Sequence, residues 1–469
     1  MDPFEQSNLT RTKLAFWLGQ QLNPDTPLFH APLGLIIPKR LDPSAFTAAF
    51  GKLVACSDVL RTVVALENGV PRQRALAHIE YTLDFVDFSA EADPYAAYCA
   101  WSDERCHILF DFHTRLFDSA LVKLADEKYV WYFCQHHIIC DLFSFLIAAQ
   151  YMSMLYEKAL DGSLDNVEAF PAFAAYIEEE LANRGALGDP GQRAYWEDRL
   201  ARGPDPISFY GRPVPRLVGA AHREDVDLGA KLSRQIRELA VSLTASAKSG
   251  HAAQFNIFAA ILFAYLNRVC GVERPSLGMP FNNRRDDLRK QTVGVFMSVL
   301  PLSVDVEESD TLNSLIAKIG ADASSILRNS AYFIHNLMHT QAHDVLVNGL
   351  FAPFPVFAGV LCDYHWPLFR NVLDPILLNF YVDPATGSFA NAFIFNSAIF
   401  DDEMRRLLIH DYDRMAHSLL DNHDVPIRDI ELVSDEDKHR LLFQWNATDT
   451  PFPDDKTIHQ LFEAQAERT

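Results

Sequence analysis

Residues 128–145 read KYVWYFCQHHIICDLFSF, and the pattern of this stretch changes in the middle. The first half is rich in aromatic and β-branched residues, which favour a β-strand. After His136 and His137, Asp141 is a typical helix N-cap, and the apolar residues that follow predict a helix that ends at Gly162. The two histidines are therefore expected where a strand leads into a helix. Because successive strand side chains point to opposite faces, at most one of them faces any given cavity.

Strand and helix patterns alternate along the rest of the chain, which predicts a mixed α/β fold. The polar stretch 163–193 contains glycine and proline and predicts a boundary between two halves. From residue 431 onward the sequence becomes polar again. We expect helices over 9–24, 42–58 and 255–270, strands over 32–38, 128–135 and 294–306, and a hairpin that turns at Asn68-Gly69.

The composition is that of a globular protein with an acidic surface. Among 469 residues, 41 are Lys or Arg and 62 are Asp or Glu, which gives a formal charge of −21. This charge repels phosphate backbones, so we expect no nucleic-acid partner. The most apolar segment, 255–266, is shorter than the ~20 residues of a membrane span, so no span is expected. The N-terminus lacks an apolar secretory segment, and seven dispersed cysteines without a CxxC pair suit a reduced, cytoplasmic protein.

Several kinds of site are compatible with the two adjacent histidines. His137 and Asp141 are four residues apart, but a catalytic zinc needs about three protein ligands and no HExxH motif is present. We therefore expect no metal. Two interpretations stay open: a pair of histidines satisfied in a core, and a histidine that acts as a base or hydrogen-bond donor. The sequence contains no GxSxG elbow and no GxxxxGK[ST] phosphate loop that would suggest another chemistry.

Ordered motifs along nearly the whole chain resemble one family. HHIICDLFS (136–144) resembles the HHxxxDGxS signature of the condensation domains of nonribosomal peptide synthetases. The other matches, in chain order, are LTRTKLAFWL (9–18) to the opening helix, SDVLRTVV (57–64) to RHExLRT without its histidine, AYWEDRL (194–200) to YWxxxL, GMPFNNR (278–284) to GxPxxxR, and VGVFMSVLPL (293–302) to IGxFxNxLPLR. The corresponding motifs of heterocyclisation and epimerisation domains are not matched.

The resemblance implies an α/β fold of two lobes, each a two-layer sandwich like chloramphenicol acetyltransferase, that form a V-shaped pseudodimer around a central tunnel. It assigns residues 1–175 to the first lobe, 176–430 to the second, and 431–469 to a linker towards an adenylation domain. The implied reaction is amide formation, in which the amine of a phosphopantetheine-tethered acceptor attacks a donor thioester. No tightly bound cofactor is implied.

The resemblance also implies roles for residues of the signature. His137 corresponds to the histidine that faces the tunnel and holds or deprotonates the attacking amine, or stabilises the tetrahedral intermediate. His136 corresponds to a structural histidine. Asp141 is expected to pair with Arg61 and to hold the turn, so its loss is expected to damage folding as much as catalysis.

Two further residues match the family, and two depart from it. Ser144 matches the signature serine, a supporting position, and Arg284 matches an arginine of the second lobe that is structural or lines the tunnel. Leu142 stands where the signature has glycine, and we expect its bulk to reshape the donor passage or the backbone turn. Ser298 stands where the second-lobe strand usually has asparagine.

The position of Met1 leads us to expect a starter domain. Met1 lies only a few residues before the opening helix motif, so no carrier protein would precede the domain if Met1 is the natural start. The donor would then be an acyl-CoA or a free-standing acyl carrier, and the product an N-acylated aminoacyl group of a lipopeptide. The expected partners are an adenylation domain and a peptidyl carrier protein downstream, and the excised domain is expected to be a monomer. The alternatives are an elongation domain with a peptidyl-carrier donor and a non-catalytic docking platform.

Overall fold

The computed structural model divides into two units, residues 1–428 and 429–469, which are described separately. It describes residues 6–184, 189–215, 217–243, 250–336, 343–351, 355–367, 371–383, 385–451 and 453–468. Met1 and residues 185–188 of the predicted boundary lie outside this set. The mixed α/β class is confirmed, while the division of the chain at residues 175 and 430 stays a prediction.

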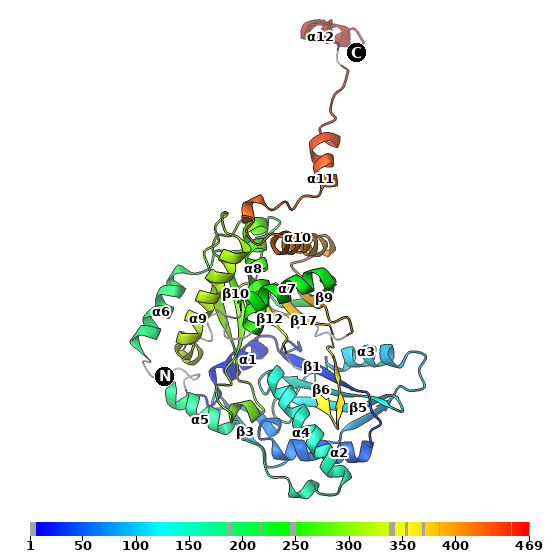
Figure 1. The fold of residues 1–469 in the computed structure, drawn as a ribbon, viewed down its shortest axis with the longest axis vertical. Coiled ribbons are helices and arrows are strands. Elements are labelled where there is room, and N and C mark those ends of the chain that lie inside the picture. The colour runs from blue at the N-terminus through cyan, green and yellow to red at the C-terminus, as the bar shows by residue number, and fades with distance from the viewer. Residues whose placement is uncertain are drawn as a thin grey trace. The chain divides into compact units, whose positions relative to one another are not determined.

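A five-stranded sheet forms the core of the first half (Figure 1). Its strand order is β15-β1-β6-β5-β4, in which only β4 and β5 run parallel. The elements of this half are α1 (Arg11–Leu22), β1 (His30–Ile37), α2 (Pro43–Cys56), η1 (Val59–Arg61), β2 (Thr62–Glu67), β3 (Val70–Ala75), β4 (Asp84–Asp87), α3 (Pro94–Arg105), β5 (Phe117–Ala125), β6 (Lys128–His136), α4 (Leu142–Leu160), η2 (Leu164–Asn166) and α5 (Ala174–Asn183).

Local sequence signals explain where these elements begin and end. Asp141 caps α4 by accepting the backbone N–H of Ser144 (2.8 Å), and Gly162 follows the helix with φ +77°. Asn68 and Gly69 have φ of +52° and +80°, as a two-residue turn between antiparallel strands requires. The predicted strand, helix and hairpin at these places are confirmed, as are the helices near the N-terminus.

The strand β6 separates two layers of core. Its odd-numbered side chains, Trp131 and Phe133, pack with α2 and α4 on one face. The even-numbered Tyr132 and Cys134 pack on the other face with Tyr98 of α3. Because β6 is buried on both faces, its sequence is a nearly continuous apolar run. It fixes where the chain emerges at His136, the end of the strand.

The second half is built around a seven-stranded sheet with the order β11-β10-β12-β17-β18-β9-β16. α7, α8 and α9 pack against this sheet, and α10 packs against α7 and α8. The elements are α6 (Pro190–Arg202), β7 (Ser208–Phe209), β8 (Arg212–Pro213), β9 (Gly219–Asp227), α7 (Gly229–Leu243), α8 (Gly250–Cys270), β10 (Ser276–Asn282), η3 (Arg289–Gln291), β11 (Met297–Ser303), α9 (Leu312–Asn336), β12 (Val345–Gly349), β13 (Val356–Phe357), β14 (Val360–Leu361), β15 (Asp363–His365), β16 (Asn371–Val372), β17 (Ile376–Val382), β18 (Phe389–Asn396), α10 (Asp402–Asp421) and η4 (Ile427–Asp429).

A segment of the second half crosses over to the first. Within residues 355–365, here called the crossing segment, β15 pairs antiparallel with β1 and completes the edge of the first sheet. The hairpin β13–β14 packs on α4, where Phe357 is fully buried. Lys39 Nζ donates to the carbonyl of Ala358 at the tip of this hairpin (2.6 Å). The first sheet is therefore complete only when both halves are present.

The helix α8 is longer than the sequence predicted. It spans 21 residues, Gly250–Cys270, instead of the expected 255–270, and is, by length and composition alone, able to cross a membrane. However, 67% of its apolar stretch is buried inside the protein, as in the core helix of a large domain. The expected buried helix and its end at Cys270 are confirmed, while its start lies five residues earlier than predicted.

Residues 429–469 form the second unit. It contains α11 (Asp435–His439), the π-helical turn η5 (Arg440–Gln444) and α12 (Ile458–Ala466). The large apolar side chains exposed on this unit are Val433, Leu441, Leu442, Phe443, Trp445, Ile458, Leu461 and Phe462.

Candidate active site

The turn between β6 and α4 carries the two adjacent histidines. His136 ends β6 and is fully buried, whereas His137 keeps part of its side chain accessible. The backbone N–H of His136 donates to the carbonyl of Leu116 (2.9 Å), and that of His137 donates to the carbonyl of Phe29 (2.8 Å). Segments before β1 and β5 therefore hold the backbone of the turn in place.

The imidazole of His137 has a defined tautomer. Its Nδ1 lies 3.2 Å from the carbonyl oxygen of Cys140, and since a carbonyl only accepts, Nδ1 carries the proton. Within the described residues no hydrogen bond occupies Nε2. Burial lowers the pKa of His137, against the opposing effects of the Cys140 carbonyl and the charge of Asp141. A neutral imidazole with a free Nε2 is able to accept a proton.

His136 is fixed in the opposite tautomer. The backbone N–H of Ile138 donates to its Nδ1 (3.0 Å), so its proton is on Nε2, which faces Gln20 Oε1 at 3.4 Å. The amide nitrogen of Gln20 donates to the carbonyls of Asn23 and Thr26 (2.8 and 2.9 Å), which sets the orientation of that amide. Burial lowers the pKa of His136 far below its usual value. Both nitrogens of His136 are thus occupied within the protein.

Asp141 is the centre of a buried hydrogen-bond network. Its side chain is 4% exposed, and Oδ1 accepts from the N–H and hydroxyl of Ser144 (both 2.8 Å). Oδ2 accepts from the backbone N–H groups of Phe296 (2.9 Å) and Met297 (3.3 Å), which belong to the second half. The same carboxylate therefore caps α4 and fastens the start of β11 to it.

Arg284 completes the network from the second half. Its Nη2 donates to Asp141 Oδ1 (3.0 Å), Ser144 Oγ (2.9 Å) and the carbonyl of Gly294 (2.9 Å). Its guanidinium lies over the ring of Phe296, 4.3 Å from the centroid, and its side chain is 1% exposed. Ser144 Oγ also accepts the N–H of Gly294 (3.0 Å). Arg284 and Ser144 are therefore structural parts of the junction between the halves.

The predicted ion pair between Asp141 and Arg61 is wrong. Arg61 ends the short helix η1, and its Nη1 donates to the carbonyls of Leu76 and Ala77 just after β3. The partner of Asp141 is Arg284. Both arginines are in motifs of the family resemblance, and the choice between them depends on how the two halves pack. That packing is not visible in local sequence.

Leu142 and Ser298 have different surroundings. Leu142 is the first residue of α4, is partly buried, and packs against the core of the first half. Ser298 is on β11 beside Met297, is 1% exposed, and its Oγ has no hydrogen-bond partner among the described residues. A buried hydroxyl without a partner lowers stability.

Sequence reasoning missed the aromatic surroundings of the histidines. The ring of Phe16 stacks on His137, with centroids 5.4 Å apart and an interplanar angle of 14°. His30 contacts His136 edge-on (6.1 Å), and burial lowers the pKa of His30 to about 4. The periodicity of a helix indicates which residues are apolar but not which ring meets a histidine. The one signal available was Gln20, a polar residue at helical spacing from Phe16 and Trp17.

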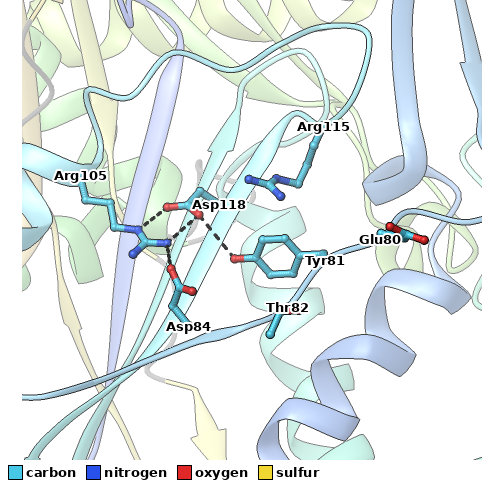
Figure 2. A pocket seen from close by; sticks show the side chains of 7 residues that line it. All are labelled: Glu80, Tyr81, Thr82, Asp84, Arg105, Arg115 and Asp118. Atoms are coloured by element: carbon cyan, nitrogen blue, oxygen red, sulfur yellow. Dashed lines mark hydrogen bonds and ion pairs between the residues drawn. The ribbon is translucent and has the colours of Figure 1, made fainter.

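A polar pocket of about 320 Å³ lies elsewhere in the first half (Figure 2). Arg105 donates to Asp118 (2.5 Å to Oδ2) and to Asp84 (2.5 Å), and Tyr81 Oη lies 3.5 Å from Asp118 Oδ1. The guanidinium of Arg115 lies over the Tyr81 ring at 4.5 Å. The charges of Arg105 are paired within the protein, so this network is structural. Among the described residues no three His, Cys, Asp or Glu side chains are grouped to hold a metal.

Comparisons with known proteins identify the family. A family model described as Condensation domain matches residues 8–362, more than half of the chain. The chain is 28% identical to the isonitrile lipopeptide synthase of Streptomyces coeruleorubidus over 333 residues, which is 71% of this chain and 22% of the relative. It is 25% identical to the dimodular nonribosomal peptide synthase of Bacillus subtilis strain 168 over 459 residues, 94% of this chain and 19% of the relative. The chain thus spans about a fifth of the length of these relatives.

Solved structures share the fold. One is a variant of the starter condensation domain of rhizomide synthetase in complex with C8-CoA and Leu-SNAC, with a TM-score of 0.78, 22% identity, and coverage of 91% of this chain and 97% of that one. Another is the first condensation domain of the calcium-dependent antibiotic synthetase with a substrate analogue, with a TM-score of 0.78, 18% identity, and coverage of 91% and 98%.

Proposed function

The chain belongs to the condensation-domain family, whose members catalyse amide-bond formation, and from this we propose that it is a starter condensation domain. It transfers an acyl group from an acyl-CoA or acyl-carrier thioester to the α-amine of an aminoacyl group on a carrier protein. The product is an N-acyl amide. The adenylation domain and carrier protein are expected in the same polypeptide, after residues 431–469.

The tautomer of His137 is the observation that carries this proposal. With Nδ1–H held by the carbonyl of Cys140, Nε2 is the atom that accepts the proton of the attacking amine. The amine attacks the thioester carbonyl, and its proton passes to Nε2 and then to the departing thiolate. One C–N bond forms, one C–S bond breaks, and His137 returns to its neutral state. His136 has no free nitrogen and serves to hold the turn.

The supporting residues act through position. Asp141, Ser144 and Arg284 fix the turn that presents His137 and join it to the second half. Arg61 fastens the chain after β3. We assign Leu142, at the start of α4, to the wall of the donor passage, because it follows the turn directly and remains partly exposed.

Two similarities support the starter subtype. A structure with the same fold is a starter condensation domain with an acyl-CoA and an aminoacyl thioester analogue bound. A relative in sequence is named as a lipopeptide synthase, the class of product that an N-acylating domain begins. Both favour an acyl donor over a peptidyl-carrier donor, and the first favours an acyl-CoA.

The test supplies the protein with octanoyl-CoA and an aminoacyl-loaded carrier protein, and measures N-acyl product by mass spectrometry. Product should form with the wild type and with the exposed-histidine control His113→Ala, and should be lost with His137→Ala. A folded His137→Ala variant of undiminished activity would refute the assigned role. Product only with peptidyl-carrier donors, and with neither acyl-CoA nor an acyl carrier, would identify an elongation domain. No product with any donor would identify a docking platform.

A further inference from the structure

One face of α1 contacts both histidines of the turn. Phe16 stacks on His137, and Gln20, one helical turn later, faces Nε2 of His136. Between them, an added Cβ on Gly19 would lie 2.6 Å from the ring of Phe29, so glycine leaves the room that this ring occupies. Residues 16, 19 and 20 lie on the same side of a helix. This set is called the histidine-facing side of α1.

Phe29 links the members of this side to the turn. Its ring contacts Phe16 edge-on (5.1 Å) and His136 edge-on (6.0 Å). Its backbone carbonyl accepts the N–H of His137 (2.8 Å). Phe16 is therefore held by a neighbour that also holds the backbone of His137. The ring that stacks on the imidazole is thus supported by packing on a second side.

We propose that Phe16 is a positioning residue for His137, a role that rests on the proposed function of that histidine. The stack fixes the rotation of the imidazole about its side chain and covers one of its faces. The hydrogen bond from Nδ1 to Cys140 fixes the ring at one atom only, and the parallel ring supplies the second restraint. Together they aim Nε2 in one direction. When a catalytic base is displaced from the productive geometry, the reaction rate falls by a large factor.

The stack also affects the charge of His137. Burial is the main cause of the lowered pKa of His137, and the ring of Phe16 is part of that burial. Its removal admits water to one face of the imidazole and raises the pKa. The titratable and charged groups on the elements around the ring are His136 (β6), His30 (β1), Cys140 and Asp141 (turn) and Lys13 (α1). Substitution of Phe16 alters none of these groups.

The experiment compares Phe16→Leu and Phe16→Ala with a matched control, Phe88→Leu. Phe88 is a partly buried phenylalanine in the opposite core layer of the same sheet, where its ring contacts Trp101 (6.3 Å). Leucine retains burial but cannot stack, whereas alanine loses both. Two kinds of measurement are made: kcat and KM for octanoyl-CoA as functions of pH, and the titration of His137 by NMR with ¹³C-labelled histidine, assigned with His137→Ala.

We expect Phe16→Leu to lower kcat about 10- to 100-fold with an unchanged KM and an unchanged titration of His137. Phe16→Ala should lower kcat at least as far and also move the acid limb of the pH profile, and the NMR titration, to higher pH. If both variants keep kcat within about twofold, or if Phe88→Leu loses as much, the inference is refuted. If the wild type forms no N-acyl product, the proposed function fails, and the NMR titration of Phe16→Ala decides the inference alone: an unchanged titration refutes it.

Discussion

Replacement of Asp141 by alanine should destabilise the protein, mainly because it leaves the buried charge of Arg284 unpaired. The carboxylate accepts four hydrogen bonds besides that of Arg284: two from Ser144 and one each from the N–H groups of Phe296 and Met297. Loss of the helix cap costs about 1 kcal/mol. Removal of one partner of a buried ion pair costs about 3–5 kcal/mol. We therefore expect Asp141→Ala to lower the free energy of unfolding by about 5 kcal/mol.

A double-mutant cycle separates the ion pair from the other contacts. Asp141→Ala and Arg284→Met each leave one buried charge unpaired, but the double variant leaves none. The double variant should be more stable than the sum of the single effects by about 3 kcal/mol. The matched control is the cycle of Asp141→Ala with Arg61→Met, for which we expect additivity to within about 0.5 kcal/mol, because Arg61 binds the carbonyls of Leu76 and Ala77 instead.

The assay is urea unfolding followed by tryptophan fluorescence, with equal slopes required across each cycle. Where Asp141→Ala does not fold, Asp141→Asn replaces it, since the asparagine oxygen still caps α4. Additive effects of the Asp141 and Arg284 substitutions would refute the assigned pair. Coupling above about 1 kcal/mol with Arg61 would restore the pairing expected from sequence.

Three further predictions concern other buried or gating residues. The side chain of Glu180 is 1% exposed and burial raises its pKa to about 7, so the folded state loses stability as the pH rises from 4.5 through 7. In urea unfolding, the free energy of unfolding of Glu180→Gln relative to wild type should therefore rise by about 3 kcal/mol between pH 4.5 and 8.5, and an equal difference at both pH values would contradict this. Leu142→Gly should broaden the set of acyl-CoA chain lengths accepted in competition assays, and an unchanged profile would remove Leu142 from the donor passage. Ser298→Ala should keep or raise the thermal midpoint, because it deletes a buried hydroxyl without a partner, whereas a loss above about 1 kcal/mol would indicate a bond to that hydroxyl.

The features that sequence predicted well depend on near neighbours in the chain. Asp141 caps the helix that begins at the next residue, and Asn68-Gly69 turns between adjacent strands, so a few residues contain the whole cause. The contact of His136 Nε2 with Gln20 and the stack of Phe16 on His137, in contrast, depend on a helix about 120 residues earlier. Those contacts exist only once the sheet has brought the segments together.

The partner of Asp141 shows the same limit more sharply. A charged pair was expected from the motif, and it is present, but with Arg284 and not with Arg61. The family resemblance supplied two candidate partners, Arg61 in the first half and Arg284 in the second half. Only the packing of α4 against the start of β11 selects between them. The crossing segment was likewise invisible, because a three-residue strand such as β15 has too little sequence to show a pattern.

The crossing segment has a consequence for synthesis on the ribosome. The strand β1 is complete once residue 37 has emerged, but its outer neighbour β15 ends at residue 365. Translation from β6 to β15 takes roughly 10–45 s at ~5–20 residues per second. During that time the outer edge of β1 offers unpaired backbone groups to any other strand, including that of a nascent chain nearby. The sheet of the first half therefore forms with an unpaired edge at β1, which is covered only when β15 has been synthesised. A chaperone would be needed during this interval.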